Sequence, residues 1–187
     1  GATITVPTGI KSGDLAVMFN YGAGTPVAAV SPGSGWTSRS NITISTRRVT
    51  AYTKILNGTE SGTFAGMDDT FDALFLNIFR RPGRPITSII VAKDDEATVG
   101  NPLGQSITAF PTGTLVAPAV TISFASADGV AHTWSAPSGA VAITTHDSTF
   151  YSGRYNLWHV GDATGSYDVD DTGAINTLTS LYIALTY

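Results

Sequence analysis

The sequence has 187 residues and a mass of 19.4 kDa, a length that suits one domain. It contains no cysteine, which excludes disulfides, thiolate nucleophiles and thiolate metal sites. Charged residues make up only 13% of the chain and the net charge is −4, which argues against a general nucleic-acid binder. Serine and threonine are abundant where most proteins have more charged residues. This composition is typical of an all-β domain and unusual for a cytoplasmic enzyme.

The sequence contains no membrane-spanning or secretory segment. No apolar run approaches the ~20 residues that a helix needs to cross a bilayer. Residues 1–6, GATITV, have neither the basic region nor the long apolar region of a signal peptide. Because an initiator methionine is missing as well, we expect the sequence to be a processed or excised piece of a longer protein.

The first half of the chain alternates short apolar segments with turn-forming clusters. This pattern predicts an antiparallel β-sandwich of jelly-roll type with about a dozen strands. The apolar run at residues 15–19 predicts a central strand, and the near-unbroken run at 71–79 predicts a core strand buried on both faces. Asn57 and Gly58 predict a turn. The strands expected here are residues 3–6, 15–19, 42–45, 49–56, 71–79 and 86–92.

The second half repeats this rhythm. Its expected strands are residues 114–117, 120–125, 130–134, 140–144, 155–160 and 178–187, with Pro118 at a bulge, edge or break. No window has helical periodicity, so little or no helix is expected, at most one turn at residues 93–97. The Gly- and Pro-rich residues 100–113 are interpreted as a loop within a single domain that spans residues 1–187.

Metal ligands are sparse. The spacing of His132, His146 and His159 fits no compact ligand motif, and we predict no histidine metal site. The oxygen-rich segment with Asp168, Asp170 and Asp171 is a weak calcium candidate. Aspartate is also a common turn residue, so an ordinary turn is the alternative. No other cofactor is expected.

A cluster of aromatic residues provides a candidate glycan-binding face. Aromatic rings stack on the apolar face of a sugar while amides and hydroxyls bond its rim, as in other mostly apolar sites with a few placed polar groups. The alternative is core packing, to which we assign Trp36. The candidate glycan-binding residues are Trp134, Tyr151, Tyr155, Asn156 and Trp158.

No motif indicates an enzyme. The sequence has no G-x-S-x-G elbow, no P-loop and no recognisable pair of catalytic carboxylates. The basic cluster Arg80-Arg81-Pro82-Gly83-Arg84 is the chain's one concentration of positive charge. It could contact phosphate, an acidic glycan or a neighbouring subunit, and the alternative is a solvated strand end.

Several segments together resemble a family of phage-encoded β-domains. Residues 6–17, VPTGIKSGDLAV, are similar to its "p-x-G-v-x-x-G-D-l-l-v" opening, and residues 34–37, SGWT, match its "p-x-G-W-t" step. Residues 51–55, with Gly58 and Thr63-Phe64, resemble its "v-y-y-K-v-a … t-f-t" hairpin.

The resemblance continues through the rest of the chain. Residues 73–81, ALFLNIFRR, are similar to the family's "a-l-l-x-x-y-r-G" strand, although Arg81 and Pro82 stand where glycine is usual. Residues 113–116 and 181–185 fit the family's second half. The matched positions have structural explanations: Gly9 and Gly13 permit turns, and Asp14 can cap or brace a loop.

The resemblance implies a non-enzymatic structural module of a bacteriophage virion, in a tail fibre, an appendage or a capsid decoration. Assembly in the host cytoplasm and display on the virion surface are then expected. By analogy with phage appendages we expect a homotrimer that contacts other virion proteins, with a bacterial surface glycan as a candidate ligand and with no nucleic acid partner and no membrane insertion. A stand-alone carbohydrate-binding module and a polysaccharide-degrading enzyme are the alternatives.

Overall fold

The structure is a computed structural model, and it divides into two compact units. The first unit is Gly1–Ile89 with Leu185–Tyr187, and the second is Ile90–Ala184. The single domain expected from the sequence stays a prediction. The residues that the structure describes are 3–23, 31–44, 47–65, 73–99, 105–108, 119–127, 132–135, 141–146, 153–160, 166–171 and 175–187.

The described residues form strands and turns, with no helix among them. Every strand pair whose register is described is antiparallel, from β1 with β5 to β14 with β9. The all-β, antiparallel class predicted from the sequence is therefore confirmed. No helix in this part of the chain has the length and apolar character that crossing a membrane would require.

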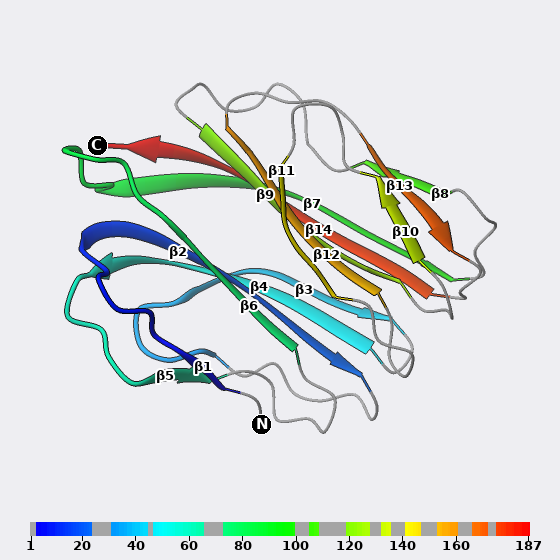
Figure 1. The fold of residues 1–187 in the computed structure, drawn as a ribbon, viewed down its shortest axis with the longest axis horizontal. Coiled ribbons are helices and arrows are strands. Elements are labelled where there is room, and N and C mark those ends of the chain that lie inside the picture. The colour runs from blue at the N-terminus through cyan, green and yellow to red at the C-terminus, as the bar shows by residue number, and fades with distance from the viewer. Residues whose placement is uncertain are drawn as a thin grey trace. The chain divides into compact units, whose positions relative to one another are not determined.

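The first unit contains a four-stranded sheet in the order β3-β4-β2-β6, drawn in blue to green in Figure 1. A two-stranded pair, β1-β5, belongs to the same unit. The strands are β1 (Thr3–Thr5), β2 (Ser12–Ala23), β3 (Thr37–Ile44), β4 (Arg47–Asn57), β5 (Thr63–Ala65) and β6 (Ala73–Phe79).

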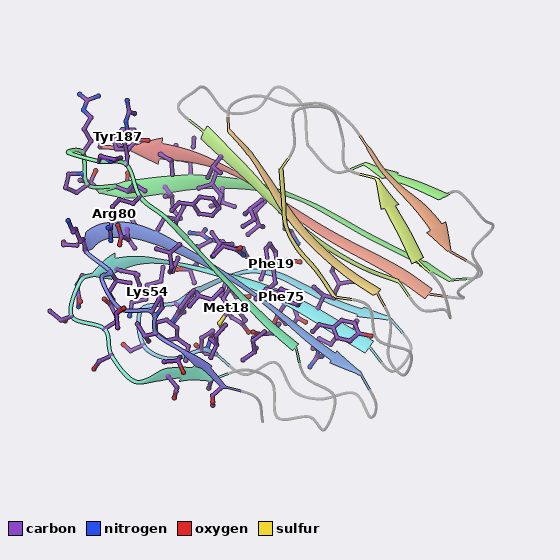
Figure 2. The ribbon with its side chains drawn as sticks, in the orientation of Figure 1. Met18, Phe19, Lys54, Phe75, Arg80 and Tyr187 are labelled. Atoms are coloured by element: carbon purple, nitrogen blue, oxygen red, sulfur yellow. The ribbon has the colours of Figure 1, made fainter. Side chains whose placement is uncertain are left out.

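β2 is the central strand of this sheet, as its apolar run predicts. It pairs with β4 on one side and with β6 on the other, and every residue of the run 15–19 is 0% exposed. Met18 and Phe19 lie in the middle of the sheet (Figure 2). Because successive side chains of a strand point to opposite faces, the burial of both residues means that β2 is covered on both faces.

One face of β2 contributes to the core of the first unit. Ala16 and Met18 pack with Val6, Leu56 and Phe64. The ring of Trp36 meets that of Phe64 edge to face, with centroids 5.0 Å apart and an interplanar angle of 84°, a favoured aromatic arrangement. The packing role predicted for Trp36 is confirmed.

β6 differs from its prediction. The described part of this segment lies at the end of the sheet order, and the side chains from Leu74 to Phe79 are half-buried, apart from Asn77, which is buried. The apolar run correctly predicts a strand, but the prediction of burial on both faces is wrong. A strand at a sheet edge has a neighbour on one side only, whatever its own hydrophobicity.

The second unit contains two sheets. Their orders are β11-β12-β9-β14-β7 and β10-β13-β8. The strands are β7 (Ser88–Val99), β8 (Gln105–Thr108), β9 (Ala119–Ala127), β10 (His132–Ser135), β11 (Val141–His146), β12 (Gly153–Val160), β13 (Ser166–Asp171) and β14 (Ile175–Thr186), of which β7 and β14 begin or end in the first unit.

Between residues 93 and 117 the structure departs from two local predictions and does not describe a third. The helical turn considered for residues 93–97 is wrong, because β7 runs through them beside β14 and pairing outweighs a weak local preference. Residues 105–108 form β8 inside the segment interpreted as a loop. The strand expected at residues 114–117 lies outside the described residues.

Candidate functional site

The candidate site begins with residues 9–14, here called the loop 9–14, which end in the first three residues of β2. Gly9 and Gly13 have φ angles of 80° and 84°, in the left-handed region that glycine adopts without strain. The pairing of β2 with β4 shifts register between Ser12 and Leu15, so Gly13 and Asp14 occupy a β-bulge. Bulges with a left-handed glycine redirect the neighbouring side chain, and here that side chain is the carboxylate of Asp14.

The carboxylate of Asp14 joins this loop to the end of β6. The backbone N–H of Lys11 donates to Oδ2 at 2.7 Å. Arg80 donates from Nε to Oδ1 at 2.7 Å and from Nη2 to Oδ2 at 2.6 Å, and its Nη2 also donates to the carbonyl of Gly9 at 2.6 Å. Asp14 is 1% exposed and the side chain of Arg80 is 38% exposed, so this two-point contact is a charge-assisted ion pair that is buried on the carboxylate side and open on the other.

The ion pair changes the acid–base properties of both partners. The guanidinium of Arg80 is the main cause that lowers the pKa of Asp14, with the N–H of Lys11 adding to it against the opposing effect of burial. The hydrogen bond to Asp14 raises the pKa of Arg80 in return. Asp14 is therefore held as a carboxylate whose charge Arg80 neutralises.

The basic turn, residues 80–85, follows directly. The N–H of Arg84 donates to the carbonyl of Arg81 at 3.3 Å, and Gly83 between them has a φ of 71°. Proline at the second position and a left-handed glycine at the third are the features of a type II β-turn. Arg81 and Arg84 thus occupy the first and last positions of a single turn.

The chain on the far side of the basic turn is also anchored. The N–H of Ile86 donates to the carbonyl of Gly13 at 3.0 Å, and the N–H of Thr87 donates to the carbonyl of Thr186 at 2.8 Å. The second bond brings the end of β14 to this region. The turn is therefore fixed at both ends, by Arg80 before it and by Ile86 after it.

An aromatic ring lies against the two arginines of the turn. The guanidinium carbon of Arg81 is 4.5 Å from the ring centroid of Tyr187, and that of Arg84 is 6.0 Å from it. Both distances are within the range of cation–π attraction. Figure 2 shows Arg80 and Tyr187 at the end of the sheet where β2 begins.

The basic turn and the loop 9–14 line a cavity of about 570 Å³, bounded on one side by Lys11 to Asp14 and on the other by Arg80 to Pro85. Lys11 and residues 80–85 are exposed. In the part of the chain that the structure describes, no carboxylate forms an ion pair with Lys11, Arg81 or Arg84. The cavity therefore carries an excess of positive charge in an acidic chain.

A second, smaller cavity of about 260 Å³ lies beside β3 and β4, with Arg39, Thr53 and Lys54 in its lining. Arg39 donates from Nε to the hydroxyl of Thr53 at 2.8 Å, and burial lowers the pKa of Arg39. Lys54 pairs with Glu60 at 3.4 Å and donates to the carbonyl of Ser34 at 3.1 Å. Both basic side chains of this cavity thus have a partner within the protein, which makes the cavity the weaker candidate.

The predicted glycan-binding residues fall in two sheets. Trp134 lies in β10, within the three-stranded sheet. Tyr155, Asn156 and Trp158 lie in β12, within the five-stranded sheet, and Tyr155 alternates with the other two along the strand. Tyr151 lies outside the described residues. The structure thus brings three of the five residues onto one strand.

The calcium candidates lie in a strand where the sequence predicted a turn. Asp168, Asp170 and Asp171 belong to β13, paired with Ser135, Thr133 and His132 of β10. A search of the described residues for three or more acidic or histidine side chains placed to hold a metal finds none. Calcium binding stays a prediction.

Sequence reasoning identified the arginines of the basic turn but missed their surroundings. The R-P-G-R order of residues 81–84 is itself the signal for a turn with an arginine at each end. The contacts with Asp14 and Tyr187 have no local signal, because these partners come from distant parts of the chain.

Comparisons of the chain with protein-family models, with curated proteins and with solved structures found no match.

Proposed function

We propose that the chain is a non-enzymatic structural module of a bacteriophage virion, a domain of a tail fibre, an appendage or a capsid decoration. The proposed fold is a jelly-roll β-sandwich, which is one particular arrangement within the all-β antiparallel class. The proposal rests on the resemblance of residues 6–17 and 73–81, among other segments, to phage-encoded β-domains.

One observation carries the proposal. Two segments of the resemblance, residues 6–17 and 73–81, meet in the ion pair between Asp14 and Arg80. Because the two residues are 66 positions apart, the contact depends on the fold and not on local sequence. The pair joins these two segments within one structural unit, as a match of both segments to a single domain requires.

The same contacts favour a structural role over a catalytic one. Both oxygens of Asp14 accept hydrogen bonds from the protein, and its side chain is 1% exposed. A carboxylate that acts as a general base must reach its substrate and keep a pKa near the working pH. Asp14 has a lowered pKa and is only 1% exposed, with both of its oxygens already bonded, which suits a structural role.

Virion location is tested on particles banded in a density gradient from a culture of the source. Mass spectrometry of the band is expected to find peptides of this chain in a constant ratio to the major capsid protein through repeated banding. Peptides that stay in the soluble fraction, or whose ratio falls with each banding, would contradict the proposal.

A further inference from the structure

We infer that the basic turn is a binding site for a phosphate group, held by Arg81 and Arg84 with Lys11 across the cavity. The inference stands on the charges and geometry of the first unit and is independent of the virion role. It assigns a ligand class to the cavity, which the resemblance to phage domains leaves open.

The backbone brings the two guanidinium groups to one place. Arg81 and Arg84 are the first and last residues of a hydrogen-bonded turn, whose Cα atoms lie within ~7 Å of each other by definition. Their guanidinium groups also lie against the same ring, that of Tyr187. Two positive charges held this close repel each other, and an anion between them removes the repulsion.

The local charges remain uncompensated by the protein. Asp14 is the carboxylate that lines the cavity, and Arg80 occupies both of its oxygens. Arg80 and Asp14 together are neutral, so Lys11, Arg81 and Arg84 supply the net charge. Ion pairing within the described residues does not quench it.

The arginines are held in place before a ligand arrives. The turn that carries them is bonded on one side through Arg80 to Asp14 and on the other through Ile86 to Gly13. The cation–π contacts with Tyr187 restrain the guanidinium groups further, while their N–H groups can still donate. A pre-positioned pair loses less conformational entropy on binding than two unrestrained arginines would lose.

The charges favour phosphate over a carboxylate. A phosphate monoester carries about −1.5 to −2 charges near neutral pH and three acceptor oxygens, whereas a carboxylate carries one charge and two oxygens. Three cations around one cavity match the phosphate better. The cavity of about 570 Å³ is also of the size that small-molecule ligands occupy, roughly 300–1,000 Å³, so it can hold a phosphate attached to a sugar or polyol.

The test is a titration of the ¹⁵N-labelled chain, followed by NMR at the arginine Nε–H groups. The probes are inorganic phosphate, glycerol 3-phosphate and acetate, each against sodium chloride of the same ionic strength. Phosphate is expected to give a saturable shift at Arg81 and Arg84. The double variant Arg81→Gln/Arg84→Gln is expected to weaken binding about tenfold or more, since bonds to charged groups are the strong ones.

Arg48→Gln is the matched control. It removes one positive charge from β4, where Arg48 donates to Thr43 at 3.0 Å, as the single variants Arg81→Gln and Arg84→Gln each do from the basic turn, and it is expected to leave phosphate binding unchanged. Tighter binding of glycerol 3-phosphate than of inorganic phosphate would identify a phosphate ester as the ligand, and equal binding would identify the phosphate group alone. Three results would overturn the inference: no saturable shift, acetate binding as tightly as phosphate, or equal weakening by Arg48→Gln.

Discussion

Asp14 links stability to pH at the scale of a single residue. Its pKa in the folded chain lies below the ordinary value, mainly because Arg80 donates to the carboxylate, while the unfolded chain keeps a value near ~3.9. Since the folded pKa is the lower one, the ion pair contributes its full stability above about pH 4 to 5. That stability is lost as the pH falls through the folded pKa.

Asp14→Asn is therefore expected to lower the free energy of unfolding at pH 7, by about 1–3 kcal/mol, and to weaken the dependence on pH below 5. Urea unfolding at pH 7, 5 and 3 measures both effects. The control is Glu60→Gln. Burial raises the pKa of Glu60, but hydrogen bonds, among them those from the N–H groups of Asn57 and Gly58, lower it, and the net shift is downward. Glu60→Gln should leave unchanged the stability that the ion pair between Asp14 and Arg80 contributes. If Asp14→Asn loses as much stability on acidification as the wild type does, this assignment is wrong.

Gly13 differs from Gly9 in having no room for a side chain. A Cβ at this position would lie 2.4 Å from Cβ and 2.7 Å from Cα of Pro85, whereas a Cβ on Gly9 would meet nothing within 4 Å. Both positions have a left-handed φ, so an alanine at either adds about 1–3 kcal/mol of strain.

Only Gly13→Ala should add a clash, which typically costs another 1–3 kcal/mol or so. The variant is expected to unfold at a clearly lower urea concentration than Gly9→Ala in the same series. Equal midpoints would mean that the segment around Pro85 can move aside freely.

At the scale of the strand, β2 supplies buried side chains to the core of the first unit. Met18 is 0% exposed and packs among buried apolar side chains, so Met18→Ala is expected to lower the free energy of unfolding by about 2–5 kcal/mol. Ile90→Ala removes an aliphatic side chain that is 61% exposed and should change it by less than about 0.5 kcal/mol. Denaturant unfolding of both variants checks the contrast, and similar losses would contradict the assignment of the core.

The elements also show what the sequence can and cannot predict. The run 15–19 predicts a central strand correctly because β2 is covered on both faces. The run at 71–79 looks just as apolar, yet β6 ends its sheet, since hydrophobicity does not encode the order of strands. The sequence does not predict β13, because aspartates such as Asp168, Asp170 and Asp171 are common in turns. In the structure, pairing with β10 and β8 outweighs that local preference.

In the candidate site, too, the sequence predicts the local features but not the contacts between distant residues. The R-P-G-R sequence predicts a turn with two arginines because its chemistry is local. The bond from Arg80 to Asp14 spans 66 positions, and the contact of Arg81 with Tyr187 spans more. Such contacts depend on strand pairing across the whole unit, and a single sequence gives no direct signal for them.

At the scale of the whole molecule, the proposed virion role predicts a particular assembly. By analogy with phage appendages, which are commonly trimeric, light scattering is expected to give about three times the chain mass of 19.4 kDa. A monomer that persists as the concentration rises would contradict the trimer.

The proposed role as a structural part of a virion is tested most directly by a cryo-electron-microscopy map of the intact particle, searched separately with each of the two compact units. We expect density for both units on the capsid surface or along the tail or its fibres, repeated with the symmetry of that part. A particle whose map is fully explained by other proteins would contradict the claim.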